Sequence, residues 1–325
     1  MSCVQRWNEL GEVPDGVGPS VVTIGNFDGV HAGHRAVLGQ VVRRARESGR
    51  GAVAITFSPH PIAVLRPDAA PEPIVSPEHR LELLAEVGLD ATLVLPFTRE
   101  LAAWSPRRFV QDVMVARLGC ALAVVGPDTR FGHRNSGDVQ TMRDLGAELG
   151  FGVEVVEDLG DDASVGRFSS TWLREIITEG DVVEAAKVLG RPHRVSGVVV
   201  HGDHRGRALG YPTANLGPDS VGVIPADGVY AGWLVRLSRP AGDPERRLPA
   251  AISIGTNPTF DGIGRRVESY VLDRDDLELY GENVGVEFTE RLRPTLRFDG
   301  VEPLLAQMAQ DVARCQELLR VVPRR

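Results

Sequence analysis

Two histidines three residues apart carry the most specific chemical signal in the N-terminal half. His31 and His34 lie at the end of residues 25–34 (GNFDGVHAGH), which join an apolar segment to a helical pattern. Free N–H groups and the dipole at a helix start attract anions, and two imidazoles there can donate hydrogen bonds to phosphate oxygens as charge develops. Gly33 leaves room for a triphosphate. These residues indicate attack on an α-phosphorus, with pyrophosphate as the leaving group.

A capped helix with two surface histidines is the simpler interpretation of the same run. The preceding strand and the full G-x-F-D-G pattern favour the phosphate site, because such a site requires a strand, a glycine loop and a helix in this order. The candidate ATP-binding residues of the run are Gly25, Phe27, Asp28 and Gly33.

Further loops add polar groups after other expected strands. Residues 58–61 (SPHP) and 126–132 (GPDTRFG) each follow a strand, although either segment alone is more typical of a turn. A later helix is expected to begin with three hydroxyl side chains and to carry an arginine one turn further on, a combination that would suit a triphosphate. Plain N-capping is the alternative there. The residues of this helix start are Ser169, Ser170, Thr171 and Arg174.

In the C-terminal half, a glycine-rich basic loop runs into residues 212–215 (PTAN). Glycines let backbone amides approach phosphate, and the Thr213 hydroxyl and Asn215 carboxamide oxygen are hard ligands that suit Mg²⁺. The loop lacks the G-K-[ST] of a Walker sequence, and a basic surface hairpin is the alternative. The candidate ATP-binding residues are Gly202, Gly206, Arg207, Gly210, Thr213 and Asn215, of which Thr213 and Asn215 are also the candidate metal ligands.

A carboxylate follows in residues 266–272 (RVESYVL), where alternation predicts a strand with Val267, Ser269 and Val271 on one face. Inside a small barrel, Glu268 could accept a proton from a substrate hydroxyl that attacks a γ-phosphate. Taken alone, it would more often be a solvated strand residue.

The elements that must position these groups alternate through the first half. Strands are expected at residues 21–24, 52–57, 92–95 and 121–125. Helices are expected between them, with Ser-Pro start signals at residues 76–77 and 105–106. This order predicts a parallel sheet covered by helices, with ligands at the carboxyl ends of the strands. Helices at residues 171–179 and 181–189 close this half.

From residue 195 on, short β-rich runs predict a small antiparallel barrel or sandwich. The expected strands cover residues 197–200, 228–237, 250–254, 266–272 and 283–288. A final helix would begin with Asp299 as N-cap and Glu302 in a capping box, and would pack on the barrel. We therefore expect one domain at residues 1–189 and a second at residues 190–325.

Composition limits the classes of protein to consider. A length of 325 residues favours two domains, and a net charge of −8 argues against a general nucleic-acid binder. No apolar run approaches the ~20 residues of a transmembrane helix, and the first residues lack a signal-peptide pattern, so the expected location is cytoplasmic. Cys3, Cys120 and Cys315 have no paired spacing and are expected to be free thiols.

The order of these motifs resembles that of the bacterial bifunctional riboflavin kinase/FAD synthetase family. Residues 25–34, 58–61, 126–132 and 169–174 are similar to its adenylyltransferase domain. The segments similar to its riboflavin kinase domain are residues 212–215, 228–230, 253–260, 267–270 and 279–281. The resemblance implies α/β plus all-β architecture: a Rossmann-like H-x-G-H nucleotidyltransferase domain, then a six-stranded antiparallel β-barrel with a terminal helix.

The resemblance also implies two reactions that need Mg²⁺. Riboflavin and ATP give FMN, and FMN with a second ATP gives FAD and pyrophosphate. It implies Mg-ATP at Thr213 and Asn215, and Glu268 as general base for the riboflavin 5′-hydroxyl. Thr129 stands where the family commonly has an aromatic residue. The flavin of the adenylyltransferase is expected near His60, Asp128, Arg130 and Phe131.

Two rival functions stay open from sequence. One is a nucleotidyltransferase with another acceptor, which the PTAN and VESY motifs argue against. The other is a non-catalytic flavin-binding protein, which the intact candidate catalytic residues His31, His34 and Glu268 argue against. The expected partners are riboflavin, FMN, FAD and ATP, with no nucleic acid and no membrane, and a homo-oligomer is compatible with the sequence.

Overall fold

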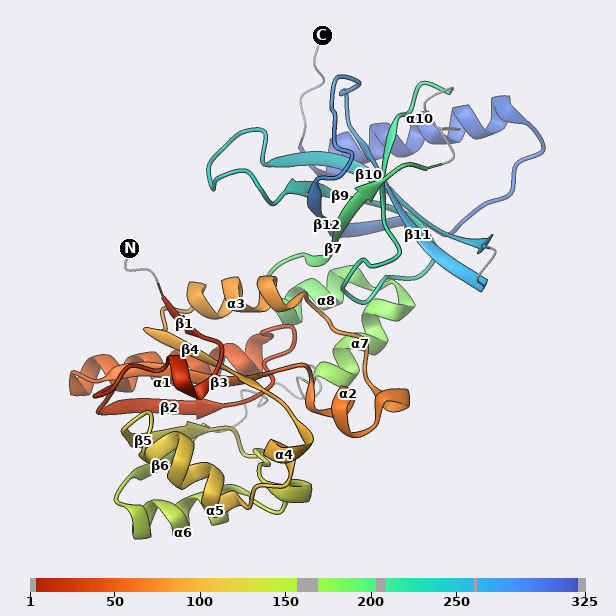
Figure 1. Ribbon diagram of the computed structural model, residues 1–325. Helices are drawn as coiled ribbons and strands as arrows, with labels where there is room; N and C mark the ends of the chain where they lie inside the picture. The colour runs from red at the N-terminus through yellow and green to blue at the C-terminus, as the bar shows by residue number, and fades with distance from the viewer. Residues whose placement is uncertain (1–3, 157–168, 203–208, 260–261, 321–325) are drawn as a thin grey trace. The chain divides into compact units, whose positions relative to one another are not determined.

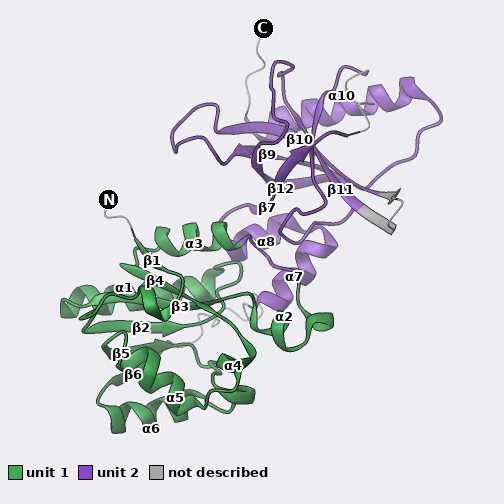
Figure 2. Cartoon of the chain, in the orientation of Figure 1, with its two compact units in different colours: residues 1–71, 77–169 green, residues 72–76, 170–325 purple. Residues whose placement is uncertain are grey.

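The computed structural model describes residues 4–156, 169–202, 209–259 and 262–320, and the chain divides into two compact units. Unit 1 comprises residues 1–71 and 77–169, and unit 2 comprises residues 72–76 and 170–325 (Figure 2). The helical pair before residue 190 therefore groups with unit 2 by its contacts. The functional boundary after residue 189 stays a prediction.

Unit 1 is built on a parallel six-stranded sheet in the order β1-β4-β3-β2-β5-β6 (Figure 1). The chain moves outward from β2 to β3 and β4 and then returns to pair β5 on the other side of β2. The carboxyl ends of β2 and β5 therefore form the topological switch point, where open α/β sheets bind ligands. The strands are β1 Gln5–Trp7, β2 Ser20–Ile24, β3 Gly51–Ser58, β4 Ala91–Pro96, β5 Cys120–Val125 and β6 Gly152–Val155.

Helices cover this sheet and leave its central strands deeply buried. All five residues of β2 are buried, including Ser20 and Thr23, which explains why its other residues are apolar. The predicted starts are confirmed at Pro77 and at Pro106, where the Ser105 side chain accepts a hydrogen bond from the Arg108 amide. The helices are α1 Ala32–Ser48, α2 Pro61–Leu65, α3 Pro77–Glu86, α4 Arg99–Ala102, α5 Pro106–Phe109 and α6 Val139–Leu149, with the π-helix η3 Val110–Val115 and the 3₁₀ turns η1 Leu10–Glu12, η2 Pro67–Ala69 and η4 His133–Asn135.

Unit 2 contains a closed antiparallel barrel in the order β10-β11-β8-β7-β12-β9, which decides between the predicted barrel and sandwich. Large apolar side chains such as Tyr230, Ile252 and Phe288 fill its interior and are fully buried. The strands are β7 His193–Val200, β8 Thr213–Leu216, β9 Gly228–Arg236, β10 Arg247–Thr259, β11 Gly262–Val271 and β12 Asn283–Arg293, and two helices precede them, α7 Ser170–Glu179 and α8 Val182–Leu189.

The terminal helix α10, Val301–Leu318, packs on β9 and β10 as predicted. Its expected N-cap was wrong. Gly300 takes the N-cap position with φ of 158°, no side chain caps the helix, and Asp299 therefore lies one residue too early for a capping box. Cys315 on this helix and Cys120 in β5 are buried free thiols, as predicted, and Cys3 lies outside the described residues. Within the described ranges, no helix is long and apolar enough to cross a membrane.

Candidate active sites

The loop between β2 and α1 is buried and has an uncommon backbone conformation. Phe27 and Val30 have φ of 50° and 42°, values that non-glycine residues rarely adopt and that cost most for a β-branched side chain. The Val30 amide donates to the Phe27 carbonyl at 3.2 Å, and Gly29 supplies φ of 82° inside this turn. Both strained side chains are almost fully buried. Packing therefore holds the loop in one shape.

His31 is the N-cap of α1 and stacks on His34. Its Nδ1 atom accepts a hydrogen bond from the His34 backbone amide at 3.4 Å. The two ring centroids are 3.7 Å apart. Because Nδ1 is an acceptor, a neutral His31 carries its proton on Nε2. That N–H is the group this imidazole can offer to a phosphate at the helix start.

His34 is held in its neutral form by its surroundings. Burial and the neighbouring His31 lower the pKa of His34 well below its ordinary value. Its Nδ1 atom is buried and has no hydrogen-bond partner among the described residues. The Phe27 and His34 rings meet in a T-shaped arrangement, with centroids 5.3 Å apart. The pair can therefore bind an anion by hydrogen bonding without both rings carrying charge.

The predicted loop at residues 58–61 lies beside this site. His60 caps α2 by accepting a hydrogen bond at Nδ1 from the Ile62 amide at 3.2 Å. Its Nε2 atom lies 3.3 Å from Asn26 Nδ2, and the donor and acceptor of this contact depend on the tautomer of His60. The structure thus joins the ends of β2 and β3.

The predicted loop at residues 126–132 has one buried and two exposed candidates. Phe131 is only 4% exposed, packs against Phe109, and exchanges two backbone hydrogen bonds with Gly137. Asp128 and Arg130 are exposed. Phe131 therefore fixes the loop from the core, and the charged residues are the ones that reach solvent.

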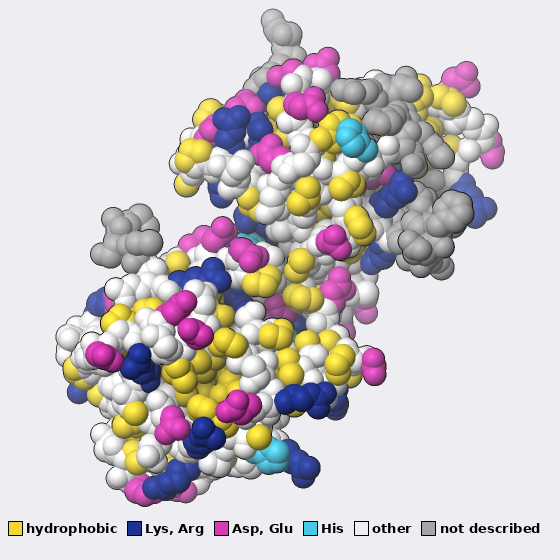
Figure 3. Space-filling model, in the orientation of Figure 1, with side chains coloured by type: hydrophobic (Ala, Val, Ile, Leu, Met, Phe, Trp, Pro, Cys, Tyr) yellow, Lys and Arg dark blue, Asp and Glu magenta, His cyan; other side chains and the backbone are white. Residues whose placement is uncertain are grey.

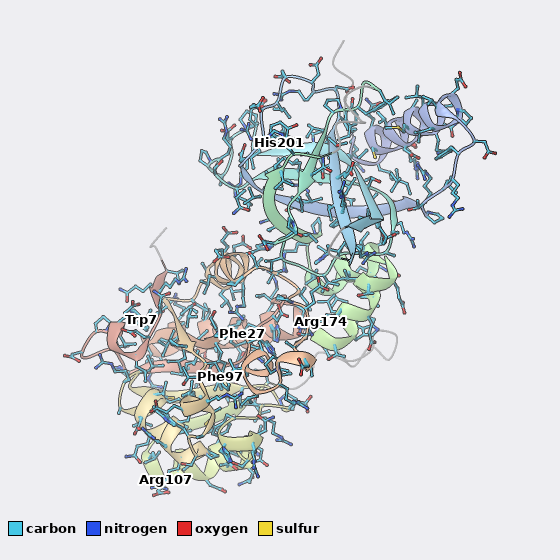
Figure 4. All side chains as sticks on the ribbon, turned by 45° about the vertical axis from the view of Figure 1, so that its right-hand side comes forward. Trp7, Phe27, Phe97, Arg107, Arg174 and His201 are labelled. Carbon is cyan, nitrogen blue, oxygen red and sulfur yellow. The ribbon has the colours of Figure 1, made fainter. Side chains whose placement is uncertain are left out.

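Two half-buried aromatic rings lie at the ends of neighbouring strands. Neither ring was predicted from the sequence to belong to the site. Phe57 in β3 and Phe97 after β4 meet edge to face, with centroids 5.5 Å apart. Figure 4 labels Phe97. The signal for them was weak, because single aromatic residues at strand ends usually belong to the core. They add apolar surface at the edge that carries the histidines.

The hydroxyl-rich helix start at residues 169–174 divides between the units. Ser169 belongs to unit 1, whereas Ser170, Thr171 and Arg174 belong to unit 2. The Arg174 guanidinium donates to the backbone carbonyls of Glu72, at 2.7 Å, and Ser170, at 3.1 Å. The assembly of these residues with the α1 site stays a prediction.

In unit 2, Thr213 and Asn215 in β8 meet Glu268 in β11. Asn215 and Glu268 are directly opposed in the antiparallel register. The Thr213 hydroxyl donates to Glu268 Oε2 at 3.4 Å, and Asn215 Nδ2 donates to the Thr213 carbonyl at 3.3 Å. The three side chains gather a hydroxyl, a carboxamide and a carboxylate in one place.

This group faces outward from the barrel. Val267 and Ser269 alternate with Glu268 and are buried, and Val267 belongs to the interior core. The predicted alternation is confirmed, but the expectation of a carboxylate inside the barrel was wrong. Successive residues of a strand point to opposite faces of the sheet, and here the apolar residues point to the interior. Glu268 is therefore half-buried on the outer face, where a substrate can approach.

Gly202 is needed because the chain passes close to Asn215. A Cβ atom on Gly202 would lie 2.6 Å from Asn215 Nδ2. The next residues of the predicted loop, including Gly206 and Arg207, lie outside the described residues, and Gly210 is exposed at φ of 85°. His201 belongs to none of the predicted site residues, and its ring stacks on Tyr280 with centroids 3.9 Å apart.

Comparison with known proteins gives both halves a family. An FAD synthetase family model matches residues 15–171 and a riboflavin kinase family model matches residues 189–319. The bifunctional riboflavin kinase/FMN adenylyltransferase of Escherichia coli K12 is 36% identical over 91% of this chain and 92% of its own. That of Listeria monocytogenes is 39% identical over 90% of each. A crystal structure of a macrolide-efflux protein from Streptococcus pneumoniae aligns with a TM-score of 0.82 and 28% identity, over 96% of this chain and 98% of that one.

Proposed function

The chain belongs to the family of bifunctional riboflavin kinase/FMN adenylyltransferases, and we propose that its two reactions take place at the two sites described above. The enzyme forms FMN from riboflavin and FAD from FMN, with ATP as co-substrate of both reactions. We assign adenylyl transfer to the β2–α1 loop of unit 1. Phosphorylation of riboflavin is assigned to Thr213, Asn215 and Glu268 of unit 2.

The observation that carries the first assignment is the stacked pair His31 and His34 at the start of α1, beside the switch point of the sheet. A phosphate oxygen of FMN attacks the α-phosphorus of ATP, and the bond from that phosphorus to the bridging oxygen breaks. Pyrophosphate leaves with the electron pair. The imidazole N–H groups and the helix N-terminus stabilise the charge that grows on the phosphate oxygens. No covalent intermediate with the protein is needed.

The second assignment rests on the outward-facing carboxylate. Glu268 accepts the proton of the riboflavin 5′-hydroxyl as its oxygen bonds to the γ-phosphorus of ATP, and ADP leaves with the electrons of the broken bond. The Thr213 hydroxyl, which contacts Glu268 at 3.4 Å, orients this carboxylate. Catalysis at this site consists of positioning and proton acceptance.

Magnesium fits the donor set of the unit 2 site. A hydroxyl and a carboxamide oxygen beside one carboxylate are the oxygen ligands that Mg²⁺ accepts, and the ion takes its remaining ligands from water and substrate phosphates. We propose that Thr213 and Asn215 hold it. When bound, it neutralises charge on the ATP phosphates.

Two variants test the assignment when riboflavin and FMN are each supplied with Mg-ATP and the flavins are separated by chromatography. We expect Glu268→Gln to lose at least about 100-fold in FMN formation while it still converts supplied FMN to FAD. His31→Ala should lose about 100-fold in FAD formation while it still makes FMN. Loss of both reactions in either folded variant would count against separate sites.

The rival functions, the expected partners, the location and the oligomeric state need separate tests. Acceptors other than FMN and a non-catalytic flavin-binding role are the rivals that the same assay separates. On the face shown in Figure 3, basic and acidic side chains of the described residues are interspersed over both units, which supports the prediction that nucleic acid is no partner. The cytoplasmic location and a homo-oligomeric state stay predictions.

A further inference from the structure

Arg80 in α3 is a buried cation close to the loop that carries His31. Arg80 is only 8% exposed, and arginine is rarely buried unless its charge is paired. Its Nη1 atom donates to the Asn26 carbonyl at 3.0 Å, and its Nη2 atom donates to the Phe57 carbonyl at 2.9 Å. One guanidinium thus joins the backbone at the carboxyl ends of β2 and β3.

The Asn26 carbonyl is held from two sides. The Thr56 hydroxyl donates to the same oxygen at 3.1 Å, so both lone pairs of this oxygen are used. A trans peptide places its C=O and N–H antiparallel. Fixing the Asn26 carbonyl toward Arg80 therefore turns the Phe27 N–H to the opposite side. The strained conformation of Phe27 begins at this peptide.

Electrostatic balance keeps Arg80 in place. Burial lowers the pKa of the Arg80 guanidinium, and the nearby carboxylates of Asp28 and Glu78 act in the opposite direction. Asp28 is itself buried and lies inside the G-x-F-D-G motif. The cation and the motif therefore stabilise each other. Removing the cation takes away the charge opposite the buried Asp28 carboxylate and one donor from each of the Asn26 and Phe57 carbonyls, of which Asn26 keeps the Thr56 hydroxyl.

We propose that Arg80 is a positioning residue for adenylyl transfer, which fixes the Asn26–Phe27 peptide so that the β2–α1 loop presents its amide and imidazole donors to the ATP phosphates. The inference rests on the proposed role of the His31 loop. Arg80 touches no reacting atom in this account. It acts through the backbone of Asn26 and Phe57, at the carboxyl ends of β2 and β3.

The test compares Arg80→Met and Arg80→Lys with Arg46→Met in the full chain. Arg46 is a matched control, because its guanidinium also binds a backbone carbonyl, that of Gly88, and a carboxylate, that of Asp90. Asp90 precedes β4, so this pair lies at the opposite edge of the sheet. The kcat and KM of adenylyl transfer, kinase activity and thermal unfolding are measured for each variant, and rates are scaled to the folded fraction.

We expect Arg80→Met to lower the kcat of adenylyl transfer about 100-fold, with the KM for FMN changed by less than about threefold, because misplaced donors act mainly in the transition state. Lysine keeps the charge but can reach only one of the two carbonyls. We therefore expect the kcat of Arg80→Lys to be about tenfold higher than that of Arg80→Met. Arg46→Met should keep full adenylyl transfer, and kinase activity should be unchanged in all variants.

The proposal is overturned if folded Arg80→Met keeps the wild-type kcat, or if its loss only matches the loss of folded protein. It is also overturned if lysine is no better than methionine. His31→Ala separates this failure from that of the assigned site. If His31→Ala keeps adenylyl transfer, the site itself is wrong, whereas an inactive His31→Ala with an active Arg80→Met contradicts only the role of Arg80.

Discussion

At the scale of single residues, His31 and His34 function as one unit. Their rings stack at 3.7 Å, so a proton on one raises the cost of a proton on the other. Burial is the larger cause of the lowered pKa of His34 and keeps this ring neutral. The positive end of α1 supplies the remaining attraction for phosphate. The proposed site would therefore bind a highly charged nucleotide largely through neutral donors, which need little reorganisation as the reaction proceeds.

A histidine in unit 2 makes stability depend on pH. His193 is only 1% exposed, and its Nε2 atom lies 2.7 Å from the Val223 carbonyl oxygen. Burial lowers the pKa of this imidazole to about 4. The unfolded chain binds this proton near pH 6.5 and the folded chain does not, so stability is lost as pH falls from about 6.5 to 4, by roughly 3 kcal/mol in all. Urea unfolding across this range measures the loss.

The control for His193 is His193→Gln, which keeps a donor for the Val223 carbonyl but cannot titrate. We expect the free energy of unfolding of this variant to fall less steeply with acid than that of the wild type, by the amount that one proton contributes. Equal slopes for the two proteins would contradict the assigned burial of a neutral imidazole.

The close approach of Gly202 to Asn215 gives a second prediction at this scale. In Gly202→Ala, the new methyl group would lie 2.6 Å from Asn215 Nδ2 and would displace the carboxamide. We expect FMN formation to fall about tenfold or more, with adenylyl transfer unchanged. Gly255→Ala is the control, since nothing lies within 4 Å of its added Cβ. Equal kinase activity in both variants would argue against a role for the Asn215 geometry.

At the scale of elements, α10 is fixed to the barrel by a buried ion pair as well as by apolar contacts. Arg293 in β12 and Asp311 in α10 are 15% and 9% exposed at their side chains and lie 2.7 Å apart. Gln307 also donates to Asp311. Because Asp311→Ala would leave the Arg293 charge buried and unpaired, we expect a loss of about 3 to 5 kcal/mol in the free energy of unfolding.

The exposed pair Arg314 and Glu317 provides the comparison for Asp311, since its side chains are 48% and 70% exposed. Glu317→Ala should change stability by less than about 1 kcal/mol. Denaturant unfolding of the two variants under the same conditions tests this contrast, and similar losses would show that the buried pair does not anchor α10.

Elements with a strong period were predictable from sequence, and short ones were not. The strands β2 to β5 were expected because buried parallel strands are continuous apolar runs. The three-residue β1 and the four-residue β8 offer too little pattern, and half of β8 is polar because Thr213 and Asn215 face outward. The start of α10 shows a different limit, because Gly300 takes the N-cap position that Asp299 was expected to fill.

The candidate sites were predictable where residue types themselves imply chemistry, as for His31, Thr213 and Glu268. Arg80 was not, because its partners are backbone carbonyls that leave no trace in the sequence, and an arginine in a helix usually faces solvent. The outward face of Glu268 also required the barrel itself, since alternation shows which residues share a face but not which face is inside.

At the scale of the whole molecule, the chain carries two group transfers in two compact units, and FMN is the product of one and the substrate of the other. Each unit has its own core, so a defect in one site need not alter the other. Separate sites joined by a shared intermediate form the central claim, and two variants with complementary defects test it together.

The decisive measurement is FAD formation from riboflavin and Mg-ATP by Glu268→Gln, by His31→Ala, and by an equal mixture of the two. Each variant alone should fail to make FAD, because one supplies no FMN and the other cannot adenylylate it. The mixture should make FAD, since FMN released by His31→Ala reaches the intact β2–α1 site of Glu268→Gln. A mixture of folded variants that makes no more FAD than either variant alone would contradict the account.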